Sequence, residues 1–227
     1  MSVRPCVLLL VILPLMSTKL INDENLRRFI VRFHNKIRGQ ERAADMMKLS
    51  WSVQLAKEAD QWAHKCVFEH AMTARGQNLG LISDPGSVKY NIGRMMQLWV
   101  EEKKEYNPRK KGCNSSCHYT QLVWAKTTHV GCSIHLCDNF GTSKRFTRNY
   151  MFFVCFYSPR GNIGDHLFTP GKHCSKCPEK SHRCNHGLCQ GHCYDHFKKC
   201  RRLAAKGKCL TDVAFMEFSC TKSCRLC

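Results

Sequence analysis

The chain has 227 residues, enough for one ordinary domain and a small second one. Its 36 Lys and Arg residues outnumber 17 Asp and Glu residues, and the formal net charge of +19 favours polyanionic partners. The alternative is a solvated basic surface without a particular partner. Beyond the N-terminus no segment supplies the roughly twenty apolar residues of a membrane span, so the sequence predicts no integral membrane span there.

The first eighteen residues have the features of a secretory signal peptide. Arg4 supplies the charged start, and an apolar run extends from Val7 to Met16. This run is too short to cross a bilayer, so we expect cleavage at the end of residues 1–18 rather than an uncleaved anchor. The protein is then secreted and extracellular. The polyanions available there are sulfated glycans, anionic headgroups and acidic receptor patches, and nucleic acid is not an expected partner.

Cysteine is the most informative residue type in the chain. There are 17 cysteines, and loss of Cys6 with the signal peptide leaves an even number, as full pairing requires. Residues 174–227 alone contain ten of them. The pairs Cys174-x-x-Cys177 and Cys224-x-x-Cys227 could also bind zinc, but a structural zinc unit suits a cytosolic protein. We therefore predict disulfides.

Apolar periodicity predicts four helices before residue 125. The apolar faces that define them contain, in chain order, Leu26, Phe29, Ile30, Phe33 and Ile37; Trp51, Leu55, Ala59, Trp62 and Ala63; Met95, Met96, Leu98, Trp99 and Tyr106; and Tyr119, Leu122 and Val123. Asn22 or Asp23 is available to cap the first. Strands are predicted at Val130–Cys137 and Tyr150–Tyr157, where aromatic and β-branched residues concentrate. Helices flanking a small sheet predict an α/β fold, built as an α-β-α sandwich.

The composition changes near Gly164, after a turn signal at residues 158–162. From Gly171 onward large apolar residues are sparse, basic residues dominate, and no long hydrophobic period survives. A segment of this length and composition cannot depend on a hydrophobic core alone. It predicts a separate small disulfide-rich module.

Several ordered motifs resemble the CAP superfamily, the secreted fold of cysteine-rich secretory proteins, insect venom allergens and plant pathogenesis-related proteins. The motifs are His34-Asn35-Lys36-Ile37-Arg38; Phe68-Glu69-His70 with Gly76-Gln77-Asn78-Leu79; Trp99 with Glu102 and Tyr106; His118-Tyr119-Thr120-Gln121-Leu122-Val123-Trp124 with Val130-Gly131-Cys132; and the run from Phe153 to Asn162. The resemblance covers about residues 24–163.

The ten tail cysteines resemble the hinge and cysteine-rich domain of the cysteine-rich secretory (CRISP) type, and the last six are similar to sea-anemone (ShK) potassium-channel toxins. The resemblance implies a signal peptide at 1–18, a CAP domain at 19–163, a hinge at 164–192 and a toxin-like domain at 193–227. Spacing alone cannot choose among the possible cysteine pairings. The pairs that the family framework implies for the tail are Cys174–Cys184, Cys177–Cys189, Cys193–Cys227, Cys200–Cys220 and Cys209–Cys224.

The cysteines of the CAP region depart from the cysteine-rich secretory pattern. Arg75 and Ser158 stand where that family has a cysteine pair, while Cys113 and Cys117 resemble the glioma-pathogenesis-related branch. The pairs implied here are Cys66–Cys137, Cys132–Cys155 and Cys113–Cys117.

In CAP proteins two histidines and two carboxylates face a central cleft. The matching residues here are His70, Gln77, Glu102 and His118. Two imidazoles and a carboxylate can bind Zn²⁺, and the resemblance therefore implies a weak zinc site formed by His70, Glu102 and His118. Gln77 replaces the usual Glu and can be neither a general base nor a charged ligand. The alternative is a hydrogen-bonded polar cleft without metal.

The toxin-like tail suggests a ligand of an ion channel. The positions of the toxins' pore-plugging Lys and Tyr are taken by Ala214 and Phe215, so we do not expect simple pore plugging. Phe215 and Phe218, with Met216, could instead bind a target or form the core of the module.

Basic residues form two clusters, of which the one in the tail could bind sulfated glycans or be merely solvated. They are Lys198, Lys199, Arg201 and Arg202 in the tail, and Arg109-Lys110-Lys111 in the CAP region. Asn114-Ser115-Ser116 is an N-glycosylation sequon inside the short Cys113–Cys117 loop, which could prevent its modification.

These features favour a secreted, non-enzymatic binding protein that modulates an ion channel or cell-surface receptor through its tail. The alternative is an extracellular sterol or lipid carrier, because CAP proteins can bind sterols. A metal-dependent protease is the least favoured function, because the sequence has no nucleophile elbow and no H-E-x-x-H helix.

Overall fold

A computed structural model describes residues 23–83, 86–110, 112–138, 150–164, 167–178, 183–191, 195, 197–212, 215–216 and 219–225. Several features expected from the sequence lie outside these residues: the signal peptide, Lys111, the Cys193–Cys227 pair, Ala214 and Phe218.

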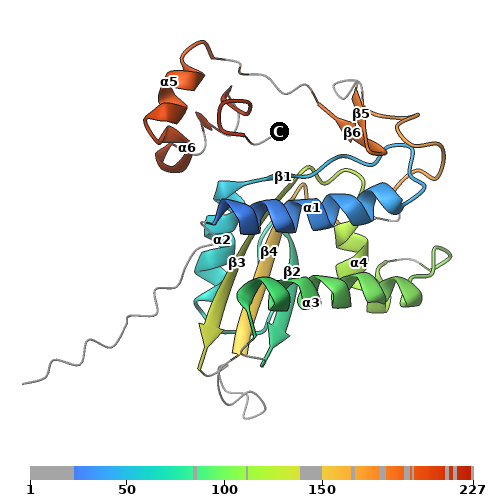
Figure 1. Cartoon of the computed structure of the whole chain (residues 1–227). Coiled ribbons are helices and arrows are strands. Elements are labelled where there is room, and N and C mark those ends of the chain that lie inside the picture. Colours follow the sequence, from blue (N-terminus) through green and yellow to red (C-terminus); the bar gives the residue numbers. More distant parts are fainter. Residues whose placement is uncertain are drawn as a thin grey trace, which may run out of the picture.

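The centre of the molecule is a four-stranded sheet with the strand order β1-β3-β4-β2 (Figure 1). Its strands are β1 (Ser50–Trp51), β2 (Gly76–Ile82), β3 (His129–Cys137) and β4 (Tyr150–Ser158). β4 pairs antiparallel with both β2 and β3, whereas β1 runs parallel to β3. The central strand, β4, is buried continuously from Phe152 to Tyr157, as expected for a strand covered on both faces.

Helices cover both faces of this sheet. They are α1 (Glu24–Gln40), α2 (Val53–Ala63), α3 (Val88–Glu101) and α4 (Cys117–Leu122), with the 3₁₀ turns η1 (Glu102–Glu105) and η2 (Asn114–Ser116). Alternate residues of β4 belong to different cores: Phe153 and Tyr157 pack with residues of α1, α3 and α4, whereas Phe152 and Phe156 pack with α2. This two-residue alternation is the pleat of a strand. The predicted α-β-α sandwich is confirmed.

Local sequence signals explain where the helices begin. Asp23 accepts a hydrogen bond from the Asn25 amide of α1 (2.8 Å), and Ser52 accepts one from the Leu55 amide of α2 (3.1 Å). Such caps satisfy amides that have no partner inside the helix. α2 lies close against β3 because Gly131 has no side chain: a Cβ there would lie 2.3 Å from the Ala56 nitrogen.

Three predicted elements differ from the observed ones. Trp51 belongs to β1 and not to the second helix, which begins at Val53. α3 ends at Glu101, so Glu102 and Tyr106 are not on a continuous helix with Trp99. The strand Gly76–Ile82 was not predicted, because its two glycines and an asparagine lower strand propensity.

The segment expected to be the hinge contains a hairpin of β5 (Arg183–Asn185) and β6 (Leu188–Gln190), called the hinge hairpin below, which packs on the α-β-α sandwich. The Cys189 amide donates to the Met46 carbonyl (2.8 Å), the Lys48 amide donates to the Cys189 carbonyl (2.9 Å), and Leu188 joins the main core with 2% exposure. The segment before the hairpin is also attached, since the Ala125 amide donates to the Leu167 carbonyl (2.8 Å).

The tail contains the short helices α5 (Cys200–Ala205) and α6 (Lys208–Thr211) around a small core of Cys200, Met216 and Cys220. Met216 therefore belongs to the core of the module and is not available to a target. Disulfides between described residues join Cys66–Cys137, Cys113–Cys117, Cys132–Cys155, Cys174–Cys184, Cys177–Cys189, Cys200–Cys220 and Cys209–Cys224. Of the described helices, none has the length and apolar character that a bilayer span requires.

Candidate functional site

Glu102 orients His118 at the junction of η1 and α4. His118 Nδ1 lies 2.5 Å from Glu102 Oε1, and the other carboxylate oxygen accepts hydrogen bonds from the amides of His118 (2.9 Å) and Tyr119 (3.3 Å). Amides in the first turn of a helix have no partner within it, so Glu102 caps α4. Because an ionised carboxylate only accepts, His118 carries its proton on Nδ1 and leaves Nε2 available as a ligand.

His70 has a matching partner in Gln77. His70 Nδ1 lies 2.8 Å from Gln77 Oε1, and the Ala71 amide donates to the same oxygen (3.0 Å). A backbone amide can only donate, so this side-chain atom is the oxygen, and His70 Nδ1 carries the proton. Nε2 of His70 is left with its lone pair. The buried Gln77 Nε2 atom has no hydrogen-bond partner in the described structure.

The indole of Trp99 supports the His118 side of the cleft. It stacks on Phe153 (centroids 5.4 Å apart, planes at 9°) and on the His118 ring (5.8 Å, 15°). Trp99 Nε1 donates to the Leu79 carbonyl (3.0 Å), which ties the indole to β2. The neighbouring Asn78 donates through Nδ2 to the His118 carbonyl (3.1 Å). His118 is therefore positioned by three contacts: its ring stacks on Trp99, its Nδ1 pairs with the Glu102 carboxylate, and its carbonyl accepts from Asn78.

His70 and His118 each keep a ring nitrogen that could bind a metal, whereas Glu102 already has other partners. Both imidazoles present a neutral Nε2, the form in which histidine binds zinc, and each donates its other nitrogen to an outer oxygen acceptor. Glu102 is occupied with orienting His118 and capping α4. In the described structure the ligand atoms of His70, Glu102 and His118 do not form a group of three within 4.8 Å.

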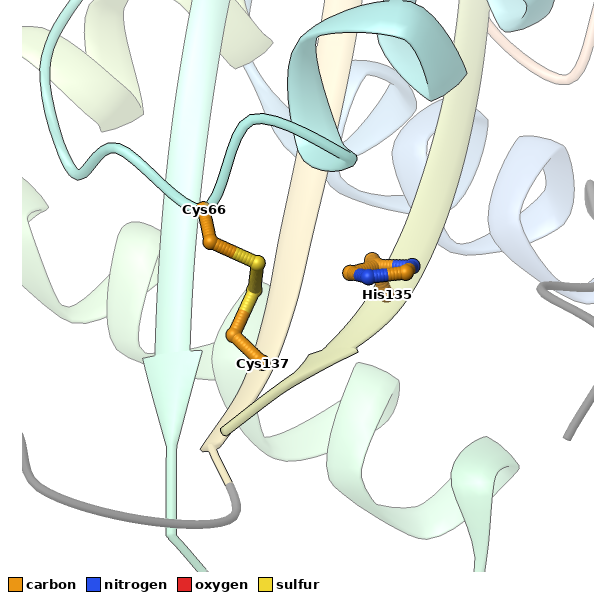
Figure 2. Close-up of side chains that lie close together, drawn as sticks. All are labelled: Cys66, His135 and Cys137. Atoms are coloured by element: carbon orange, nitrogen blue, oxygen red, sulfur yellow. A yellow bond between two sulfur atoms is a disulfide. The ribbon is translucent and has the colours of Figure 1, made fainter. Parts of the chain in front are cut away.

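Two other groups of potential metal ligands are explained by disulfides. Figure 2 shows His135 beside Cys66 and Cys137, whose sulfurs are 2.01 Å apart and bonded to each other. The second group, Cys174, Cys177 and Cys189, likewise consists of disulfide-bonded cysteines. A sulfur in a disulfide is not the thiolate that zinc requires.

The first motif, at residues 34–38, contributes two buried polar side chains with a structural role. Both His34 and Arg38 have 0% exposure. The Arg38 guanidinium donates to the carbonyl oxygens of Met47, Leu122, Trp124, Ala125 and Thr127 at 2.6–3.2 Å. Arg38 thereby joins α1 to the two segments that lead into the parallel strands β1 and β3. His34 and Arg38 are four residues apart, and this helical spacing is the sequence feature that predicts both side chains on the inward face of α1.

The tail presents an aromatic pair beside its cationic cluster. Phe215 is 38% exposed and packs edge-on against Phe197, which is 39% exposed (centroids 5.5 Å, planes at 83°). Lys198 and Lys199 directly follow Phe197, and Arg201 and Arg202 are exposed on α5. Sequence reasoning found Phe215 and the cations but missed Phe197, because its partner lies eighteen positions away across a disulfide-bonded module.

Asn114 is exposed within the Cys113–Cys117 loop. The hydroxyl of Ser116, the third residue of the sequon, is buried with the rest of its side chain and donates to the Cys113 carbonyl (2.6 Å). Arg109 and Lys110 are exposed in the turn before this loop.

The class of protein is defined by an α-β-α sandwich, by two histidines that side-chain oxygens orient, and by a disulfide-rich extension. Residues 31–157 match the model of the CAP family, described as the cysteine-rich secretory protein family, and the chain belongs to this family. Peptidase inhibitor 15 of Homo sapiens is 34% identical over 179 residues, covering 70% of this chain and 68% of the relative. Cysteine-rich secretory protein LCCL domain-containing 2 of Homo sapiens is 36% identical, covering 70% of this chain.

Several of these relatives are longer than the matched region. The alignment covers 35% of the LCCL domain-containing relative and 64% of peptidase inhibitor 15 of Xenopus laevis. Among solved structures, NaASP2 with Zn²⁺ matches with a TM-score of 0.62 and 26% identity, over 74% of this chain and 96% of that chain. BmVAL-1 also matches with a TM-score of 0.62 and 26% identity, over 95% of its length.

Proposed function

We propose that this protein is a secreted, non-enzymatic binding protein that acts on an ion channel or cell-surface receptor through its tail, with the CAP domain as a docking platform. The observation that carries the proposal is the exposed Phe197–Phe215 pair beside Lys198, Lys199, Arg201 and Arg202. Exposed aromatic side chains next to cations are typical of binding surfaces. The cysteine spacing of the tail supports a toxin-like domain at 193–227.

Three observations support a non-enzymatic function. Gln77 cannot accept a proton as a general base, and Glu102 is already engaged by His118 and two backbone amides. Relatives carry the name of peptidase inhibitors and not of peptidases. The family relationship and the expected signal peptide support an extracellular location.

We further propose that the CAP domain binds zinc weakly and reversibly through Nε2 of His70 and of His118. The support is a feature that both histidines share. Nδ1 of each ring is hydrogen-bonded to a side-chain oxygen, of Gln77 or of Glu102, which leaves Nε2 on the other side of the ring for a metal. A neighbour of the same fold is described with Zn²⁺. Bound zinc would link the segment between α2 and β2, which contains His70, to α4, which contains His118.

Electrophysiology tests the tail function. Full-length protein, applied to cells that express a panel of ion channels, should alter at least one current. The Lys198→Glu/Lys199→Glu variant should lose most of this effect, while the matched control Arg109→Glu/Lys110→Glu, with the same change in charge, should retain it. Equal losses in both variants would show that net charge and not the tail surface is responsible. A protein that alters no current but binds sterol would favour the carrier function.

A further inference from the structure

A groove of about 1140 Å³ runs along α1, and its lining includes neither the two candidate histidines nor the cationic cluster of the tail. Its walls are α1, the strand residues Ser50 and Trp51, the hinge hairpin and the end of the tail. Figure 1 shows α1 crossing the front of the CAP domain, with the β5–β6 hairpin near its C-terminal end and the tail helices above its start. Three parts of the chain that are distant in sequence therefore share one concave surface.

The residues that line this groove carry a strong excess of positive charge. Its basic lining residues are Arg27, Arg28, Arg32, Lys36, Lys48 and Arg225, whereas its acidic lining residue is Glu24. Arg28, Arg32 and Lys36 follow one another at intervals of four residues, so they form a row about 12 Å long on one side of α1. Like charges at this spacing weaken a helix. The row is therefore not explained by helix stability.

Two of the six basic residues that line the groove have no ion pair in the described part of the chain. Glu24 is shared between Arg28 (3.5 Å) and Arg225 (3.6 Å), and Lys48 donates to the neutral Gln190 side chain (3.4 Å). Arg32 and Lys36 are exposed and have no ion pair within the described part of the chain. An anionic ligand would find these two groups ready to pair.

The floor of the groove is fixed. Asn35 donates through Nδ2 to the Leu49 carbonyl (2.9 Å) and accepts from the Leu49 amide (2.8 Å), which holds the strand residues against α1. Leu49, Trp51 and Leu188 are each under 10% exposed, at 1%, 7% and 2%. They form an apolar part of the groove's lining, between α1 and the hinge hairpin.

We propose that this groove binds a sulfated polysaccharide chain, and that Arg32 and Lys36 are its central contacts. A row of cations in a concave channel suits an extended polyanion better than a flat membrane, and guanidinium groups pair bidentately with oxyanions. A chain that carries charge on every sugar unit matches this continuous row of cations better than a peptide whose acidic side chains are interspersed with neutral ones. Because Arg225 belongs to the tail, a bound chain would contact the CAP domain and the tail together.

The inference does not depend on a channel or receptor. It assigns sulfated glycans to α1 instead of the tail cluster, which remains the surface proposed for the cell-surface target. The two proposals can therefore fail separately.

Calorimetry with a size-defined heparin oligosaccharide, at several salt concentrations, tests the site in the full-length protein. Reversing two charges in Arg32→Glu/Lys36→Glu should weaken binding roughly tenfold or more and flatten its salt dependence, because exposed ion pairs are screened by salt. The neutral pair Arg32→Gln/Lys36→Gln should show a smaller loss in the same direction. Arg109→Glu/Lys110→Glu is the control with an equal change in net charge and should bind almost as the parent does.

Five outcomes would overturn the proposal. The parent protein could fail to bind the oligosaccharide, or the control could lose as much affinity as the groove variant. Lys198→Glu/Lys199→Glu could account for the loss instead, which would return the site to the tail. Equal binding of a desulfated oligosaccharide, or stronger binding of a poly-glutamate peptide, would show that sulfate is not what the groove recognises.

Discussion

His118 Nδ1 lies 2.5 Å from Glu102 Oε1, and the same carboxylate caps the helix on which His118 stands. The position of the imidazole and the start of α4 are thus set by one side chain. His70 has a similar hydrogen bond to Gln77, but the Gln77 amide is neutral where Glu102 has a carboxylate. This asymmetry between two histidines leads to the first prediction.

Zinc binding should depend on both histidines and on their partners. His70→Ala/His118→Ala should abolish it, and Glu102→Gln should weaken it by about 10–100-fold, as is typical of outer partners of metal ligands. Gln77→Glu should tighten binding, because a carboxylate makes the partner imidazole more basic. Calorimetry with Zn²⁺ measures these affinities, and Glu101→Gln is a matched exposed control. Unchanged affinity in the double alanine variant would exclude the site.

The buried His34 should make the protein less stable in acid. Its Nδ1 lies 2.8 Å from the Ile30 carbonyl, its Nε2 lies 2.9 Å from the Tyr157 hydroxyl, and burial lowers its pKa to about 4. The unfolded chain, with a histidine pKa of about 6.5, binds the proton first as the pH falls.

The contribution of His34 to the free energy of unfolding is therefore fully present above pH 6.5. It falls by up to about 3 kcal/mol as the pH is lowered from 6.5 to 4. Denaturant unfolding from pH 7.5 to 4.5 measures it. His34→Gln should flatten the pH dependence, whereas His186→Gln, an exposed control, should not. An equally steep loss in His34→Gln would assign the effect to other groups.

Arg38 should be indispensable for folding. Burial lowers its pKa to about 9, so it stays charged at neutral pH, and five carbonyl oxygens surround it. Arg38→Met should lower the free energy of unfolding by at least about 3 kcal/mol, because buried acceptors lose their donors. Arg32→Met on the exposed side of α1 should change it by less than about 0.5 kcal/mol. Similar unfolding midpoints for the two variants would contradict this role.

Two glycines should respond to alanine with opposite signs. At Gly131 a Cβ would lie 2.3 Å from the Ala56 nitrogen and 2.5 Å from the Ser52 carbonyl oxygen, so Gly131→Ala must displace α2. At Gly93, in α3, the nearest atom would be Phe29 Cζ at 3.4 Å. Gly93→Ala should stabilise by about 0.5–1 kcal/mol, as expected for alanine in a helix. Thermal unfolding of both variants measures the contrast, and equal effects would contradict the close approach.

Limited proteolysis without reduction should release the tail by cleavage between Gln190 and Cys193, because a cut after Cys193 would leave the tail attached through the expected Cys193–Cys227 disulfide. The backbone of Cys189 hydrogen-bonds the hinge hairpin to the CAP domain. The described contacts of the tail with the CAP domain are instead at the surface: Lys57 Nζ donates to the Leu210 carbonyl (3.4 Å), and Arg225 pairs with Glu24 (3.6 Å). First cleavage between Asn162 and Cys174, where the composition changes, would instead place the boundary before the hinge.

The sequence by itself determined the family, the sandwich and the cysteine-rich tail, because these depend on hydrophobic period, capping residues and motif order. Asp23 and Ser52 cap helices, and β4 follows its aromatic and β-branched run, since these are local properties of the chain. Only the tertiary structure decided the rest. Glu102 became a helix cap and an orienting partner because α3 ends one residue before it, and Phe197 met Phe215 through a fold closed by disulfides. The basic row of α1 became a groove only when the hinge hairpin and Arg225 were placed beside it, since no local pattern encodes contacts between segments more than a hundred residues apart.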